Sequence, residues 1–184
     1  MFFKFNSTKS AQAAGILLHR NNGSMDKYLF IKMLYIADRE SLRRWCEPIT
    51  GDVPVSTKHG PVLSIIYDLT KGEAIQHRAS WSPFISDVDK QTNQISLKAD
   101  PGRDRLSNNE VKLIEGVYEE FKDFSWANMK AYCHEFPEFE DVGEGSKEIP
   151  LKNILLAVGK TEGQILQIEK DIQEMIVTDL VMEG

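Results

Sequence analysis

Residues 31–69 constrain the fold of this chain more than any other stretch. They begin in an amphipathic helix that ends in RESLRR, pass through the connector ITGDVPVSTKHGPV, and then return to helical spacing. Pro48 ends the first helix, because proline lacks a backbone N–H and its ring clashes with the preceding turn. The stretch therefore predicts a helix, a compact connector and a second helix.

The connector itself changes its apolar period to two. Val53 and Val55 point to one side, and glycine and proline break the run, which predicts a short edge strand or extended loop at residues 53–58. The sequence HGPV at residues 59–62 is then expected to open a helix, with Pro61 at its first position, where a missing N–H costs nothing.

Helical stripes and helix-capping residues recur through most of the remaining chain. Asp26, Ser107 with Glu110, Ser125 and Thr161 stand where their side chains can bind the free N–H groups of a first turn. The predicted helices, with their caps, cover approximately residues 7–20, 26–44, 61–71, 107–121, 125–136, 150–159 and 161–182.

Residues 74–106 are the least helical part of the chain. Residues 74–81, 84–88 and 94–97 are predicted as short strands separated by polar turns. We therefore expect a mainly α fold: a single helical domain over residues 1–184, with a small β-hairpin or short sheet inserted around residues 53–58 and 74–97.

Composition favours a cytoplasmic protein. A chain of 184 residues with 41% hydrophobic and 27% charged residues suits one soluble domain. Cys46 and Cys133 show no paired spacing, which favours a reducing compartment. The first ten residues carry too short an apolar run for a signal peptide, and no apolar stretch is long enough to span a membrane.

The net charge of -6 is unevenly distributed. Residues 1–50 hold eight basic and four acidic side chains, whereas residues 106–184 hold seven basic and seventeen acidic ones. The acidic part is either a set of solvated helix faces or a face that steers a basic partner. The acidic balance disfavours nucleic-acid binding by the whole chain, although the basic first 50 residues keep a nucleic-acid-binding regulator as an alternative.

Metal and cofactor chemistry have no support in the residue spacing. The four histidines and two cysteines lack the paired ligands of zinc sites, so we expect no metal and no cofactor. The chain also lacks GxSxG, P-loop and GxGxxG motifs. A small hydrolase-like enzyme built on Asp38, His59 and His134 remains an alternative, and it requires these three side chains to share one cleft.

Polar residues on the helix before the connector are candidates for binding. Lys32, Tyr35 and Arg39 fall in one helical sector, which is either a solvent-exposed stripe or a charged and aromatic surface for a partner. Trp45 and Trp126 are expected in the core.

The last predicted helix has a short apolar repeat. Ile165, Ile168, Ile172 and Met175 follow a 3-4-3 spacing, but Asp179 occupies the next heptad position. So short a repeat favours docking on the protein's own core over a coiled coil, with homo-oligomerisation through this helix as the alternative.

The connector and its flanking helices carry a family resemblance. KMLYIADRESLRR, PITGD and KHGPVLSIIYD resemble the Panacea domain, also called the SocA-like antitoxin domain, whose members show K-L-x-Y-x-x-D, I-T-G and G-P-V motifs and a later histidine before a proline-containing turn. The matching residues are Lys32, Leu34, Tyr35, Asp38, Ile49, Thr50, Gly51, Gly60, Pro61, Val62 and His134. The resemblance spans residues 11–159 and leaves residues 161–184 as an appended helix.

The resemblance implies a function in protein binding. It implies an antitoxin of a type II toxin–antitoxin pair, often carried by phages or mobile elements, that neutralises a cognate protein toxin by direct contact and is not an enzyme. We expect the contact at Lys32, Tyr35, Asp38 and Arg39 together with residues 59–62. Asp38 has an alternative, structural role, in which it accepts backbone N–H bonds from the I-T-G turn.

Overall fold

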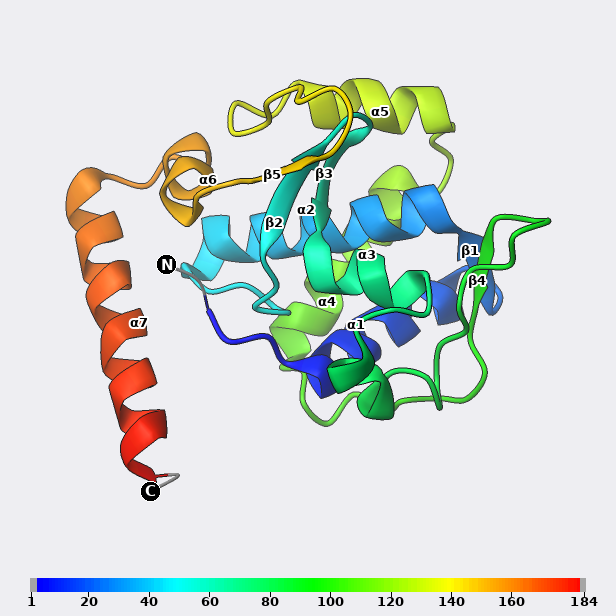
Figure 1. The fold of residues 1–184 in the computed structure, drawn as a ribbon, viewed down its shortest axis with the longest axis horizontal. Coiled ribbons are helices and arrows are strands. Elements are labelled where there is room, and N and C mark those ends of the chain that lie inside the picture. Colours follow the sequence, from blue (N-terminus) through cyan, green and yellow to red (C-terminus); the bar gives the residue numbers. More distant parts are fainter. Residues whose placement is uncertain (1–2, 183–184) are drawn as a thin grey trace.

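Helix α2 runs through the middle of the molecule and most of the other elements pack around it, whereas α7 lies at one side, next to α6 (Figure 1). The computed structural model describes residues 3–182, with side chains described to residue 178. In chain order the elements are α1 (Ser7–Arg20), β1 (Ser24–Asp26), α2 (Lys27–Trp45), β2 (Pro54–Thr57), β3 (Gly60–Leu63), α3 (Ser64–Thr70), the 3₁₀ helix η1 (Ile75–Ser80), β4 (Gln94–Ser96), α4 (Asn108–Phe121), α5 (Trp126–His134), β5 (Ser146–Glu148), α6 (Leu151–Ala157) and α7 (Glu162–Met182). The prediction of a mainly α fold is confirmed.

The helix starts follow from local capping chemistry. The Asp26 carboxylate accepts hydrogen bonds from the backbone N–H groups of Tyr28 and Leu29, at 2.9 and 3.3 Å. Ser107 and Glu110 form the reciprocal capping box predicted for α4. These interactions join residues two or three positions apart, so the sequence alone was sufficient to predict them.

Two small antiparallel sheets complete the fold. β2 lies between β3 and β5 in the larger sheet, and β1 pairs with β4 in the other. β2 and β3 form a hairpin in which Thr57 lies opposite Gly60. β5 reaches the other edge of β2 from the segment that follows α5, and Val55 lies opposite Glu148.

The structure corrects three of the predicted elements. Residues 84–88 form no strand and contribute an isolated bridge from Ile85 to Leu97. Residues 60–63 form strand β3, and the helix starts at Ser64, so the prediction of a helix opening at Pro61 is wrong. Pairing of this segment with β2 prevailed over the preference of proline for a first helical position. Residues 75–80 form the 3₁₀ helix η1 instead of a strand.

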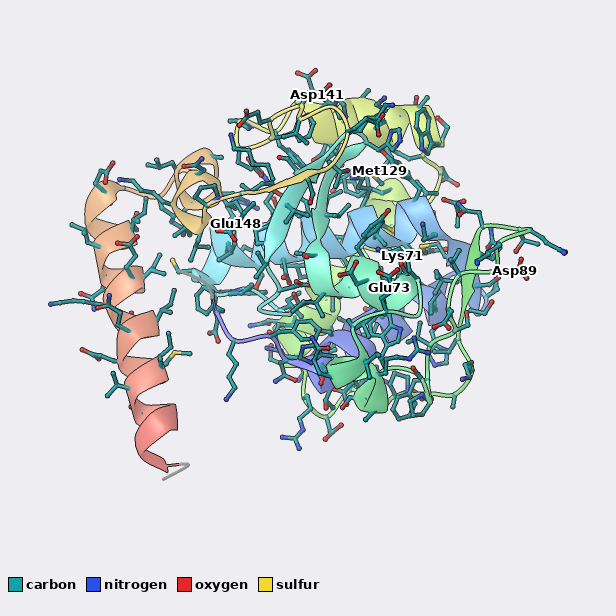
Figure 2. All side chains as sticks on the ribbon, in the orientation of Figure 1. Lys71, Glu73, Asp89, Met129, Asp141 and Glu148 are labelled. Atoms are coloured by element: carbon teal, nitrogen blue, oxygen red, sulfur yellow. The ribbon has the colours of Figure 1, made fainter. Side chains whose placement is uncertain are left out.

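The buried apolar side chains form two clusters. The larger one joins α1, α2, β3, α3, α4 and α5, and Figure 2 labels one of its members, Met129, on the side of α5 that faces the body. The smaller cluster joins the end of α2 to α6 and α7 through Leu42, Leu155 and Ile165. The last helix is therefore attached through a core of its own.

Within residues 3–182, no helix combines the length and the hydropathy that crossing a membrane requires. Both cysteines are free, and Cys46 adopts a left-handed conformation (φ 63°) at the end of α2.

Candidate functional site

Three of the polar motif residues of α2 are buried. Lys32, Tyr35 and Asp38 are 0%, 1% and 4% exposed, and Arg39 is partly buried. An exposed stripe at these residues, whether solvated or partner-binding, was therefore the wrong expectation. Their side chains face the connector and the segment after α5.

Lys32 ties α2 to the β-hairpin. Its Nζ donates a 2.7 Å hydrogen bond to the carbonyl of Pro61 and lies 5.3 Å from the centre of the Tyr28 ring. Burial removes water from the ammonium and lowers the pKa of Lys32 to about 7. One lysine thus fixes the middle of β3 against the central helix.

Gly60 lets three elements meet closely beside this lysine. Its φ of +101° is in the region that favours glycine, and an added Cβ would lie 3.1 Å from the Nζ of Lys32, 3.4 Å from Cys133 and 3.5 Å from His134. The structure therefore brings together the GPV motif, the motif lysine and the late motif histidine.

His134 has a mixed environment at this junction. Its ring packs on Phe139 with centroids 4.4 Å apart, while its Nε2 is buried without a hydrogen-bond partner. Burial and the nearby charge of Lys130 lower the pKa of His134, which favours the neutral imidazole.

Tyr35 and Arg39 bind the same carboxylate. Tyr35 Oη donates to Glu138 Oε1 at 2.9 Å, and the Arg39 guanidinium donates to both Glu138 oxygens at 2.6 and 3.3 Å. Arg39 also stacks over the ring of Phe136 at 4.3 Å. Burial and the Glu138 charge raise the pKa of Tyr35 well above its ordinary value. These contacts attach the segment after α5 to α2.

Asp38 holds the I-T-G turn. It accepts hydrogen bonds from the backbone N–H groups of Ile49 and Thr50 at 3.0 Å each, and from the Thr50 hydroxyl. Burial raises the pKa of Asp38 to about 7, against the opposing effect of these hydrogen bonds. These contacts are the ones expected if Asp38 has a structural role and accepts backbone N–H bonds from the I-T-G turn. Gly51 follows with φ +71°, and an added Cβ there would meet the carbonyl of Lys4.

Asp52 performs a role that the sequence did not suggest. It accepts hydrogen bonds from Ile65 N at 3.0 Å and Ile66 N at 2.8 Å, and so caps α3 from a distance along the chain. Burial raises its pKa to about 6. No spacing pattern identifies such a cap, because the hairpin lies between the acid and the helix that it serves.

The exposed part of the site lies where the hairpin tip meets the start of α5. We call Lys58, His59, Trp126 and Lys130 the tip patch. Trp126 is 49% exposed, its ring centre lies 6.0 Å from that of His59, and Lys130 Nζ lies 5.2 Å from it. Tyr28 supports the patch from below, since its Oη donates to the His59 carbonyl at 2.8 Å.

The expectation that Trp45 and Trp126 lie in the core is wrong. Trp126 and Trp45 are 49% and 40% exposed, whereas Trp81 is fully buried. Among the motif residues named from the sequence, His59 is the one that reaches the tip patch. Trp126 and Glu138 were missed as site residues, because neither follows a motif and both depend on how α5 packs against the hairpin.

The three side chains of the hydrolase alternative have different partners. Both oxygens of Asp38 bind Ile49 and Thr50, and His59 packs on Trp126 at the surface. Among residues 3–182, no group of three or more His, Cys, Asp or Glu side chains could hold a metal ion.

Comparison with known families matches residues 30–139 to the family described as antitoxin SocA-like, Panacea domain. The match begins inside α2 and ends after α5. It therefore contains the tip patch and the buried contacts that Lys32, Tyr35, Asp38 and Arg39 form. It is shorter than the expected range of residues 11–159 and leaves out α1, α6 and α7. No curated protein and no solved structure gives a significant match.

Proposed function

This chain belongs to the family of SocA-like antitoxins that carry a Panacea domain, and from that premise we propose that it neutralises a cognate protein toxin by direct contact, as the antitoxin of a type II pair. The family match across residues 30–139 is the observation that carries the proposal. A protein partner accords with the half-exposed aromatic side chain that the tip patch offers.

We assign the contact to the tip patch. The half-exposed Trp126 supports this assignment, because Trp, Tyr and Arg are enriched among the few residues that provide most of the binding energy at protein interfaces. The buried residues Lys32 and Glu138 then have a positioning role, since they fix the hairpin and the end of α5 on α2.

The ion pairs argue against nucleic acid as the partner. Of the basic residues in the first 50, Lys9 pairs with Glu110, Arg20 with Glu115 and Arg39 with Glu138, while Lys32 is buried. Arg43 and Arg44 both pair with Glu40. Little of the basic surplus therefore remains to neutralise phosphates.

A catalytic role has little support in these contacts. The proposal therefore treats the protein as a binding protein and not an enzyme, since Asp38 is occupied by the I-T-G turn.

Co-expression with the product of the adjacent open reading frame tests the function. The neighbour should arrest growth when expressed alone, and this chain should restore growth and co-purify with it. A harmless neighbour, or one that stays toxic beside this protein, would show that the proposal is wrong.

Substitution of Trp126 tests the site. Trp126→Ala should weaken toxin binding by about 2–4 kcal/mol, measured by calorimetry on the purified proteins. Trp45→Ala is the matched control, because Trp45 is 40% exposed and is the last residue of α2. The tip patch lies at the other end of this helix, next to Tyr28. An equal loss of toxin binding in the two variants would show that the tip patch is not the contact. Circular dichroism checks that both variants fold.

A further inference from the structure

Helix α7 buries only part of its apolar stripe. Ile165, Ile168 and Ile172 are 1%, 7% and 2% exposed and pack into the smaller core. Met175 and Ile176 follow Ile172 by three and four residues, so they continue the same helical face. They are 50% and 46% exposed.

The exposed end of the stripe extends past the part of the body to which α7 is attached. Figure 1 shows α7 leaving α6 and running along the side of the molecule, with no other labelled element beside its second half. The exposed fractions of Met175 and Ile176 agree with this view. An apolar face thus continues from a packed half of a helix onto an unpacked half.

Charge indicates what kind of surface could cover it. Glu169 lies seven residues before Ile176 and Asp171 lies four residues before Met175, so these two acids flank the exposed pair. Within the described residues, neither forms an ion pair with a lysine or arginine. Lys170 is the basic residue between them. A second copy of α7 laid on this stripe would bring acidic rims together, which costs free energy. A basic partner would not have this cost.

We propose that Met175 and Ile176 dock an apolar surface, ringed by lysine or arginine, on the cognate toxin. The inference rests on the proposed antitoxin function and adds a second contact to it. The family match ends at residue 139, so this contact lies outside the matched domain. The apolar pair supplies affinity, and the acidic rim accelerates association in a salt-dependent manner.

A double substitution tests the apolar contact. Met175→Gln with Ile176→Gln retains good helix formers and removes the apolar surface. Binding to the purified product of the adjacent open reading frame should weaken by about 10–100-fold. Leu166→Gln is the matched control: Leu166 is 63% exposed on the same helix, lies off the stripe, and its substitution should change binding by less than about threefold.

A charge substitution tests the acidic rim. The charge variant Glu169→Gln with Asp171→Asn should lower the association rate at low salt and flatten its dependence on salt. An association rate that matches the unmodified protein at every salt concentration would contradict the basic partner.

The outcomes separate this inference from the function on which it rests. If the unmodified protein fails to neutralise the neighbour, the antitoxin proposal falls. If it neutralises and the double variant binds equally well, the α7 contact alone falls. Light scattering on the free protein provides the last comparison. If the unmodified protein is a dimer and the double variant is a monomer, the stripe binds a second copy of this chain and the inference is overturned.

Discussion

At the scale of single residues, the least expected feature is a fully buried lysine. Lysine is rarely buried without a partner, so the sequence favoured an exposed Lys32, yet the structure places it between α2 and β3 with the Pro61 carbonyl as acceptor. The tertiary contact with the hairpin decides its position. No periodicity within α2 could have indicated it.

The lowered pKa of Lys32 predicts how stability changes with pH. The pKa is about 7 when folded and 10.5 in the unfolded reference, so between these values the unfolded state binds more protons. The contribution of Lys32 to the free energy of unfolding therefore rises with pH, by up to about 2.5 kcal/mol from pH 7 to about pH 9. Urea unfolding should show this rise for the unmodified protein relative to Lys32→Met, and parallel pH curves would contradict it.

Gly51 makes a second prediction at this scale. Gly51→Ala places a Cβ in a left-handed conformation and against the Lys4 carbonyl, which should lower the free energy of unfolding by about 2–4 kcal/mol. Gly116→Ala is the control, because a Cβ at this position in α4 has open space and improves helix propensity. Thermal melts should move in opposite directions for the two variants.

At the scale of elements, the sequence predicted features that depend on neighbouring residues, but it did not predict pairing between distant segments. The caps at Asp26 and Ser107 involve residues two or three positions apart and were predictable. The strand at residues 60–63 depends on β2, and the attachment of α5 depends on Glu138, which is 99 residues from Arg39. The candidate site is built mainly from contacts of this second kind, so its motif residues were predictable but their surroundings were not.

The Arg39–Glu138 pair allows a prediction of how much this attachment contributes to the free energy of unfolding. Arg39→Met leaves the fully buried Glu138 carboxylate without its cation, and should lower the free energy of unfolding by about 3–5 kcal/mol in chemical denaturation. Adding Glu138→Gln to the variant should recover most of the loss, since the buried charge is then gone.

An exposed ion pair provides the comparison. Arg43 pairs with Glu40 at 2.8 Å on the same helix, with half of the arginine side chain exposed. Arg43→Met should cost less than about 1 kcal/mol. If Arg39→Met costs as little, the pair does not hold the end of α5 on α2.

At the scale of the whole molecule, the uneven charge is partly consumed inside the protein. Lys9–Glu110, Arg20–Glu115 and Arg39–Glu138 join the basic first 50 residues to the acidic residues 106–184. The sequence predicted the uneven charge. Its two interpretations, solvated helix faces and a face that steers a basic partner, did not include this internal pairing. What remains acidic at the surface includes α7 and the segment around Asp141, which Figure 2 labels at the outer edge beyond α5.

The two separate cores predict two levels of local stability. The smaller core joins α6 and α7 to the end of α2, whereas the larger one joins α1, α2, α4 and α5. Backbone amides of α7 should therefore exchange with deuterium faster than those of α2, measured by mass spectrometry of peptides. Equal protection of α2 and α7 would mean that the molecule opens as one unit.

Strand β5 has a consequence for protein engineering. It lies beyond residue 139, where the family match ends, yet it pairs with Val55, Ser56 and Thr57 on the outer edge of β2. A chimera that joined residues 1–139 to a foreign tail would leave that edge with unpaired N–H and C=O groups, which readily recruit strands from other chains. Grafts intended to exchange the tails of such proteins should instead be spliced after Glu148, so that the transplanted unit carries its own third strand.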